Sequence, residues 1–393
     1  MAAVTKSTAR AARRTKPPLA DIPVVVATTR RQRHRLSRTQ VAAFEAELTA
    51  IYHAAKADIG ERDARHIRKM VRVAQGSAIA GRSLLMFGFG PLSFVAGVAA
   101  LANAKILENM EVGHNVMHGQ YDWMNDPRFA SQTYDWDNVC DGEDWRHSHN
   151  VMHHNHTNII GLDKDLGYGV LRMDGDTPWK PRHLLNPINN ALLALLFQYG
   201  VGAHDADIAH WLKSSKDERK EILRKMKPFV RKIGKQWFKD YALFPVIGFW
   251  NAPRIFVGNV SANLIRNLWS YAIIFCGHFP EGTQTFTQAE TANETKGDWY
   301  IRQLLGSANI EGSKLMHVMS GHLSHQIEHH LFPDLPAHRY VEIGPQVRGV
   351  VENYGLPYNT GSFARQLGTV MKKVFRYALP APGAKLDTVA LAA

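Results

Sequence analysis

The stretch from Trp145 to His156 reads Trp-Arg-His-Ser-His-Asn-Val-Met-His-His-Asn-His and is crowded with side chains that bind metals. In a helix, His149 and His153 lie on one face, where two imidazoles can chelate one ion. His154 points about 100° around the helix from His153. An adjacent pair can thus serve two different metals. The stretch therefore predicts a helical, metal-binding segment.

Two further clusters share this character. His114-Asn-Val-Met-His118 repeats the spacing, and Gln326-Ile-Glu-His329-His330 ends in a second adjacent pair. A lone histidine is usually a surface or capping residue, but most of the chain's 20 histidines fall in or near these clusters. The three clusters together predict one site with two metal ions.

The ligand types narrow the choice of metal. Imidazole-rich sites suit zinc, copper, nickel and iron. Cys140 and Cys276 are too few and too far apart for a disulfide framework or for a cysteine-based zinc or iron–sulfur site, and they are consistent with a reducing compartment. Carboxylate-bridged di-iron bundles carry Glu-x-x-His motifs, and Glu111-Val-Gly-His114 is the only nearby example. We therefore expect a dinuclear site with histidine ligands alone.

Three apolar windows, 83–104, 184–203 and 241–280, alternate with the clusters. Each is long enough for a crossing of roughly 20 residues. The run Gly88–Pro91 in the first window fits either a kink or a hairpin turn. Because the clusters must meet on one side of the membrane, we expect 184–203 to supply one crossing and 241–280 one net return. A buried core helix is the alternative for any single window.

The charge is distributed unevenly. Residues 1–40 carry ten Lys and Arg and one Asp, and so account for most of the net charge of +12, which argues against a nucleic-acid binder. We predict a disordered basic arm, either simply solvated, attracted to anionic lipid, or acting as an organellar transit peptide. A mean hydropathy of −0.25 requires a large water-facing part beside any membrane part, and we assign it to 120–182 and 205–240.

In this order, the clusters resemble the His-x-x-x-His, His-x-x-x-His-His and Gln-x-x-His-His boxes of the membrane fatty-acid desaturase family. The likeness includes Thr157-Asn-Ile, the stretch Asp163–Tyr168 and the stretch Gln326–Pro336, and it covers about 104–358. Within the family it is closest to bacterial acyl-CoA desaturases of the mycobacterial type.

The resemblance implies an all-α, integral-membrane fold with about four transmembrane helices and a cytosolic helical cap that holds a di-iron site. The desaturase domain would span 41–375, between the arm 1–40 and a tail 376–393. Two iron ions, dioxygen and two external electrons would introduce a cis double bond into an acyl chain lying in a hydrophobic tunnel. The protein would be a multi-pass protein of a bacterial inner membrane.

The resemblance also implies the metal ligands. Seven histidines stand on box positions, and an eighth lies at the end of the third apolar window, where the family takes an additional ligand from a helix end. These ligands are His114, His118, His149, His153, His154, His278, His329 and His330. We expect no catalytic side chain beyond the metal site.

Other polar residues near the boxes have less certain roles. Where the family commonly has Asn, this chain has His322, so His322, His325 or Gln326 could complete the third box. The histidines outside the boxes are expected in supporting or surface roles: His147, His156, His317 and His338.

Electrons must come from another protein, because the sequence has no His-Pro-Gly-Gly haem signature and no Gly-x-Gly-x-x-Gly or phosphate loop. We expect a separate reductase with flavin and iron–sulfur centres, docking on the basic segment 213–239. The other partners are dioxygen, the membrane and a fatty acyl substrate, as acyl-CoA or acyl-lipid. The rival functions are a di-iron lipid hydroxylase with the same ligands and, in another class, a histidine-rich metal transporter.

Overall fold

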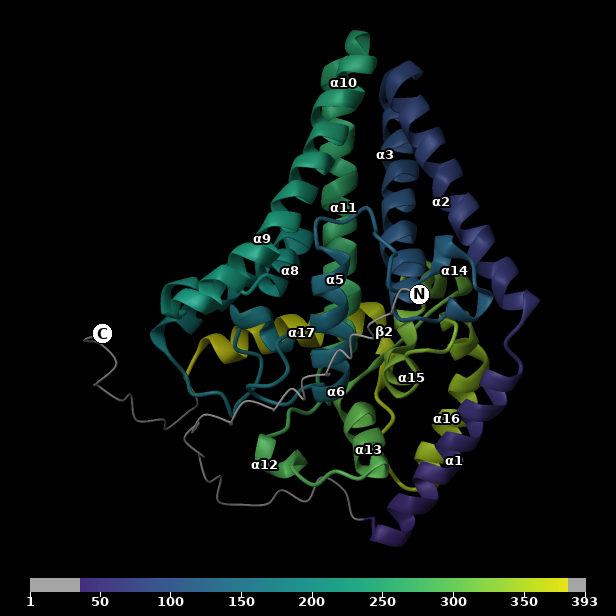
Figure 1. The fold of residues 1–393 in the computed structure, drawn as a ribbon, viewed down its shortest axis with the longest axis vertical. Coiled ribbons are helices and arrows are strands. Elements are labelled where there is room, and N and C mark those ends of the chain that lie inside the picture. Colours follow the sequence, from purple (N-terminus) through teal and green to yellow (C-terminus); the bar gives the residue numbers. More distant parts are fainter. Residues whose placement is uncertain (1–35, 381–393) are drawn as a thin grey trace, which may run out of the picture. The chain divides into compact units, whose positions relative to one another are not determined.

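Long helices dominate the computed structural model, which describes residues 36–380 (Figure 1). Within this part of the chain, two helical hairpins stand side by side and form a stem. The first hairpin consists of α2 (Glu61–Phe87) and α3 (Gly90–Ile106). The second consists of α9 (Lys216–Trp237), which continues through η8 (Phe238–Leu243) into α10 (Phe244–Ile247), and of α11 (Ala252–His278). Helix α3 packs against both α2 and α11.

The first hairpin turns at the glycine-rich run, so the hairpin interpretation is confirmed. Helix α2 ends at Phe87, Gly90 adopts a left-handed φ of 72°, and Pro91 follows in the first turn of α3. Deeper in the hairpin, a Cβ on Gly81 would lie 2.7 Å from the backbone nitrogen of Leu101. The absence of a side chain at Gly81 therefore lets α2 and α3 approach closely.

The expected crossing at 184–203 is wrong. The segment forms two short helices, α7 (Asn186–Leu195) and α8 (Phe197–Asp205), because Leu196 leaves the helical region with φ −109° and ψ 27°. A helix of ten residues spans about 15 Å, half of a hydrocarbon core about 30 Å thick. Both helices pack against α11 instead. In the second hairpin the chain runs from the base of the stem to its tip through α9 and α10, which form the rising segment, and α11 runs back to the base (Figure 1).

Hydropathy did not identify the rising segment because α9 carries many charged residues, most of them exposed, and because Asp240 adds a charge that is paired inside the stem. Asp240 is fully buried and accepts hydrogen bonds from Lys105 at 2.8 Å and from Arg82 at 3.2 Å. Lys239 lies 2.5 Å from a carboxylate oxygen of Asp137. Among the described residues, one continuous helix, Gly90–Met117, is long and apolar enough by itself to cross a membrane.

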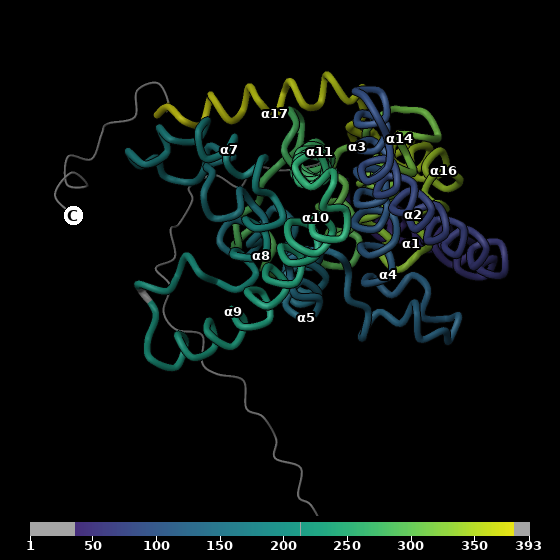
Figure 2. The backbone as a smooth tube through the Cα atoms, turned by 90° about the horizontal axis from the view of Figure 1, so that it is seen from above, coloured from purple at the N-terminus to yellow at the C-terminus, as the bar shows by residue number. Residues whose placement is uncertain are grey.

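Below the stem, four helices enclose the largest hydrophobic cluster of the described chain. They are α1 (Arg38–Ala57), α13 (Lys296–Gly306), α15 (Gln326–Leu331) and α16 (Tyr340–Asn353). Figure 2, viewed from above the hairpin tips, shows α17 (Phe363–Ala378) crossing one side of the molecule beside α7. Helix α17 contacts both α7 and α11.

Short elements connect these helices. In chain order they are η1 (Leu107–His114), α4 (Asn115–Met117), η2 (Asp122–Met124), η3 (Pro127–Phe129), α5 (Gly142–Trp145), η4 (Arg146–His153), α6 (His154–His156), η5 (Leu166–Gly169), η6 (Pro181–Leu185), η7 (Ile208–Lys213), η9 (Phe249–Asn251), α12 (Gln288–Thr291), β1 (Asn309–Glu311), α14 (Lys314–Met319), η10 (Leu323–His325), η11 (Ala337–Arg339) and β2 (Thr360–Ser362). The strands β1 and β2 pair in parallel, with Asn309 opposite Thr360.

The helical content agrees with the expected all-α class. Most of the predicted basic arm 1–40 lies outside the described residues, and α1 already begins at Arg38 behind a capping box formed by Ser37 and Gln40. The predicted tail 376–393 also lies largely outside them, although α17 continues to Ala378.

Candidate metal centre

The histidine clusters meet where the stem joins the lower helices. η1 carries His114 at the lower end of α3, η4 carries His149 and His153, and α11 ends at His278. Both η1 and η4 are π-helices, which are rare and occur frequently at functional sites. His114 of the first box and His149 and His153 of the second thus lie in the same uncommon type of helix.

Four histidines form the first ligand group. One nitrogen from each of His114, His118, His149 and His329 lies within 4.8 Å of the others. The rings of His118 and His329 are 4.7 Å apart and nearly perpendicular. The group combines η1, η4 and α15, which are far apart in the sequence.

The second ligand group contains His153, His278 and His330, whose donor nitrogens also lie within 4.8 Å of one another. The ring of His278 is 4.7 Å from that of His153 and 4.8 Å from that of His330. His278 lies in no histidine box and enters this group as the last residue of α11.

His154 lies between the two groups. Its ring stacks on His330 at 4.4 Å and meets the edges of His118 and His329 at 4.8 Å each. With His329 and His330 it also forms a ligand set of its own. The structure thus brings all eight histidines with a predicted ligand role into one place.

Many ring nitrogens here are buried without a hydrogen-bond partner among the described residues. They include Nε2 of His114, His118, His149 and His153, Nδ1 of His278, and both nitrogens of His154 and His329. Leaving one buried polar atom unpaired costs about 1–3 kcal/mol. A set of such atoms that point at one another is explained by metal ligation, so the residues fit a pair of metal ions.

The protonation state of the imidazoles also suits a metal. Burial, and then the neighbouring histidines, lower the pKa of His154, His329 and His330 well below the usual value. These imidazoles are therefore neutral near pH 7, and the neutral form is the one that binds metals.

Carboxylate and amide groups orient the ligands from behind. His153 Nδ1 lies 3.0 Å from Asp163 Oδ1, and Asp163 also accepts the backbone N–H of Asn158 at 2.7 Å. His330 Nδ1 lies 3.1 Å from Gln303 Oε1 and 3.2 Å from the hydroxyl of Thr157. Such partners fix the tautomer and direct the other ring nitrogen toward the metal.

Of the three candidates for the third box, Gln326 lies beside a predicted ligand. Its Nε2 lies 3.0 Å from His278 Nε2, and its Oε1 is buried without a partner. His322 instead reaches Glu111 at 2.9 Å, and the ring of His325 packs 4.7 Å from that of His317.

The remaining histidines lie outside the two ligand groups. His147 is exposed, His156 is partly buried at the end of α6, and His338 stacks on His66. Sequence reasoning missed Asp165, which lies 3.5 Å from His149 Nδ1 and could join a ligand set with His149 and His153. The acidic residues that follow the second box in the sequence could have pointed to Asp165.

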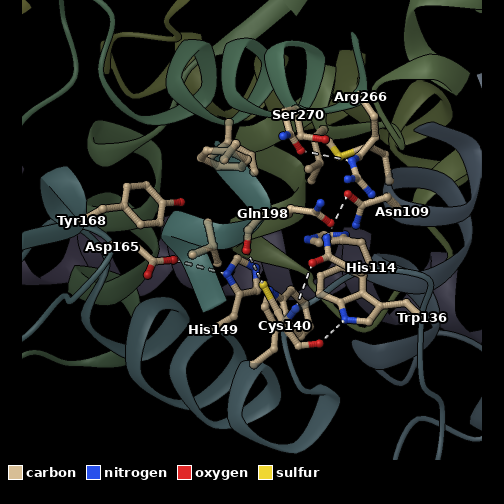
Figure 3. Close-up of a pocket in the computed structure, with 18 of the residues that line it drawn as sticks. Asn109, His114, Trp136, Cys140, His149, Asp165, Tyr168, Gln198, Arg266 and Ser270 are labelled. Carbon is tan, nitrogen blue, oxygen red and sulfur yellow. Dashed lines mark hydrogen bonds and ion pairs between the residues drawn. The ribbon is translucent and has the colours of Figure 1, made fainter. Parts of the chain in front are cut away.

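A cavity leads away from the histidines between η1, α8 and α11 (Figure 3). Its walls include the aromatic side chains of Tyr168, near Asp165, and of Trp136, near His114, together with Trp145 and Phe197. Farther along α11 the lining becomes polar, and Arg266 and Ser270 lie there with Asn109 (Figure 3). A long, mainly apolar molecule could lie along this cavity with one of its atoms next to the histidines.

Together the fold and the site define a helical protein in which two groups of histidines, suited to metal ions, border a cavity with aromatic and polar walls. The model of the family described as fatty acid desaturase matches residues 88–362. The chain belongs to the fatty acid desaturase family and is an oxidoreductase that introduces double bonds into fatty acyl chains.

Individual relatives agree with this assignment. The NADPH-dependent stearoyl-CoA 9-desaturase of Mycobacterium tuberculosis is 44% identical over 349 residues, which cover 88% of this chain and 82% of the relative. The Delta(5) fatty acid desaturase A of Dictyostelium discoideum is 26% identical over 68% of this chain and 59% of its own length. The sn-1 linoleoyl-lipid 6-desaturase of Synechocystis is 24% identical over 69% of this chain and 77% of its own.

Proposed function

We propose that this desaturase acts on long-chain acyl-CoA, that it requires dioxygen, and that two iron ions held by histidines introduce a cis double bond. The observation that carries the proposal is the pair of histidine groups joined by His154 at the end of a cavity whose walls include Trp136, Trp145, Tyr168 and Phe197.

The histidines divide into two sets for the two ions. His114, His118, His149 and His329 would hold one ion, while His153, His278 and His330 would hold the other, with His154 within reach of both. The irons, with dioxygen and electrons, would supply an oxidant for non-acidic C–H bonds, which acid–base side chains cannot attack. Asp163, Thr157 and Gln303 would keep the ligand rings in position.

The cavity walls would position the substrate. Trp136, Trp145, Tyr168 and Phe197 would hold the acyl chain and exclude water from the carbons beside the histidines. An 18-carbon saturated acyl-CoA is the first substrate to test, because the 44% identical relative is a stearoyl-CoA 9-desaturase.

We assign the two hairpins to four membrane crossings, with the histidine site on the cytosolic side of a bacterial inner membrane. Between base and tip, both hairpins expose apolar side chains: Ile79 in α2 is 69% exposed and Val257 in α11 is 50% exposed. Large apolar groups exposed in this way are typical of surfaces that face lipid. Two hairpins also return the chain to one side, as a site built from all three boxes requires.

Electrons would come from a separate reductase with flavin and iron–sulfur centres. Its docking surface would include the exposed basic side chains of α9, among them Lys220, Arg224 and Lys235. The name of the M. tuberculosis relative refers to NADPH, which is consistent with a nicotinamide-driven chain of electron carriers. Turnover should therefore stop when either oxygen or the reductase is left out.

The test is expression of the full chain with a flavin and iron–sulfur reductase in a host that lacks desaturases, followed by mass spectrometry of its fatty acids. The expected product has lost two hydrogen atoms at adjacent carbons, and it should be absent with His329→Ala. A product that has gained an oxygen atom would instead identify a hydroxylase. Sustained desaturation with NADPH but no reductase would contradict the proposed electron supply.

A further inference from the structure

We propose that His66, Glu111 and His322 form a separate mononuclear site for a divalent transition-metal ion of the zinc type. One donor atom from each residue lies within 4.8 Å of the other two. None of the three belongs to the histidine groups of the desaturation site. The proposal therefore does not rest on how that site works.

The three ligands come from elements that are far apart in the sequence. His66 lies in α2, Glu111 lies in η1, and His322 lies in the turn before η10. His66 Nε2 is 2.7 Å from Glu111 Oε1, and His322 Nδ1 is 2.9 Å from Glu111 Oε2. Each carboxylate oxygen thus faces one imidazole nitrogen.

The negative charge of the Glu111 carboxylate favours a bound cation between the three side chains. The side chain of Glu111 is 1% exposed, and in the described part of the chain its ion-pair partners are His66 and His322, with no Lys or Arg among them. A buried carboxylate is unfavourable unless a positive group compensates its charge. A divalent ion between the two imidazoles and the carboxylate would satisfy all three groups.

The set of ligands matches a known kind of metal site. Two imidazoles and one carboxylate, with a remaining position for water, suit Zn²⁺ and neighbouring divalent ions. The side chain of His66 is 20% exposed, so the site has a route for entry of the ion and of water.

The backbone holds His322 in an uncommon conformation. His322 has a φ of 59° and follows Gly321, which has a φ of 65°. A Cβ on Gly321 would lie only 2.2 Å from the backbone oxygen of Met110, the residue before Glu111. The turn is thus pressed onto η1, and a strained non-glycine residue is kept where its ring meets Glu111. Strain of this kind is characteristic of functional sites.

His66 is supported from behind. His338 stacks on its ring at 4.2 Å with an interplanar angle of 20°, and His338 Nε2 lies 2.9 Å from Asp63 Oδ1. Asp63 in turn accepts from Arg339 Nε at 2.6 Å. A bound ion would therefore connect α2 to the turn that leads into α15 with His329 and His330.

The experiment is a titration of the purified, iron-loaded full-length enzyme with Zn²⁺, with iron and zinc measured in the same samples. We expect one additional zinc ion per chain with no release of iron. In His322→Asn and Glu111→Gln the affinity for this ion should fall at least about tenfold. His325→Asn is the control, because His325 is nearby but contacts His317 instead.

X-ray absorption at the zinc edge gives a second readout. The bound ion should have nitrogen and oxygen ligands at about 2.0–2.1 Å and no sulfur. If zinc does not bind, binds to the two variants as tightly as to the unaltered enzyme, or displaces an equal amount of iron, His66, Glu111 and His322 form only a hydrogen-bonded triad. If the enzyme proves inactive, the zinc titration still tests this site. If it lacks its irons, the histidine groups of the desaturation site also take up zinc, and the proposed site is then measured as one zinc ion per chain that the unaltered protein binds and His322→Asn does not.

Discussion

His278 shows at the scale of one residue how a ligand can be found outside a sequence motif. It lies in no box, yet it is the last residue of α11 and its ring contacts His153 and His330. We expected His278 to be a metal ligand because of the predicted membrane topology together with the family resemblance. The structure places the ring among the other ligands, and the ligand role itself can be tested.

We predict that His278→Ala loses iron and nearly all activity, as His329→Ala should, because each removes an imidazole that faces the other ligands. Iron content of the purified protein and desaturation by mass spectrometry are the measurements. His156→Ala is the matched control and should keep its iron, since His156 lies outside both ligand groups. Normal iron and turnover in His278→Ala would remove His278 from the site.

Asp163 should matter although it binds no metal itself. It is 5% exposed and holds His153 Nδ1, so Asp163→Asn weakens the group that orients this ligand. We expect a loss of about 10–100-fold in metal affinity or activity. Asp176→Asn, at an exposed position, should have little effect. Equal behaviour of the two variants would show that Asp163 does not orient the ligand.

At the same scale, the choice among His322, His325 and Gln326 could not be made from the sequence. All three lie within one short stretch, and spacing alone permits each of them. The left-handed backbone at Gly321 and His322 turns His322 toward Glu111 and leaves Gln326 beside His278. That turn depends on contact with Met110, more than two hundred positions away in the chain.

At the scale of elements, a turn or helix could be predicted when its own residues determine it, and could not be predicted when contacts with other helices determine it. The hairpin at Gly88–Gly90 is encoded locally by glycine and proline, and it was within reach of prediction. The crossing expected at 184–203 failed because the break at Leu196 follows from packing against α11. The rising segment with α9 was missed because α9 carries many exposed charges, and because a hydropathy average counts the buried, paired Asp240 in the same way as an exposed carboxylate.

The close approach of α2 and α3 leads to a matched pair of substitutions. In Gly81→Ala the new Cβ would meet backbone atoms of α3 at 2.7 and 2.9 Å, so we expect destabilisation of about 1–3 kcal/mol. In Gly76→Ala the new Cβ meets nothing within 4 Å, and α2 should gain about 0.4–1 kcal/mol. Thermal unfolding in detergent measures both. A stabilised Gly81→Ala would contradict the packing of the hairpin.

At the scale of the whole molecule, the topology that we propose places the tips of both hairpins on one side of the membrane. The native cysteines are buried, so single introduced cysteines can report on accessibility. We predict that Phe89→Cys and Phe249→Cys react with an impermeant thiol reagent added to intact cells. Leu212→Cys, which is 86% exposed in η7, should react only after the cells are opened. Labelling of Phe89→Cys and Phe249→Cys from opposite sides would exclude the two-hairpin topology.

The π-helical form of η1 and η4 also restricts how this gene can change. Each hydrogen bond of a π-helix spans one more residue than in an α-helix, so loss of a single codon in either segment would let the backbone relax to the α form. Every side chain beyond the deletion would then rotate by about 100°. Point substitutions leave the direction of the other side chains unchanged. Deletion of one codon between His149 and His153 would instead turn all the ligand side chains that follow it in the helix away from the site. Natural variation in these two segments should therefore consist of replacements rather than of insertions or deletions.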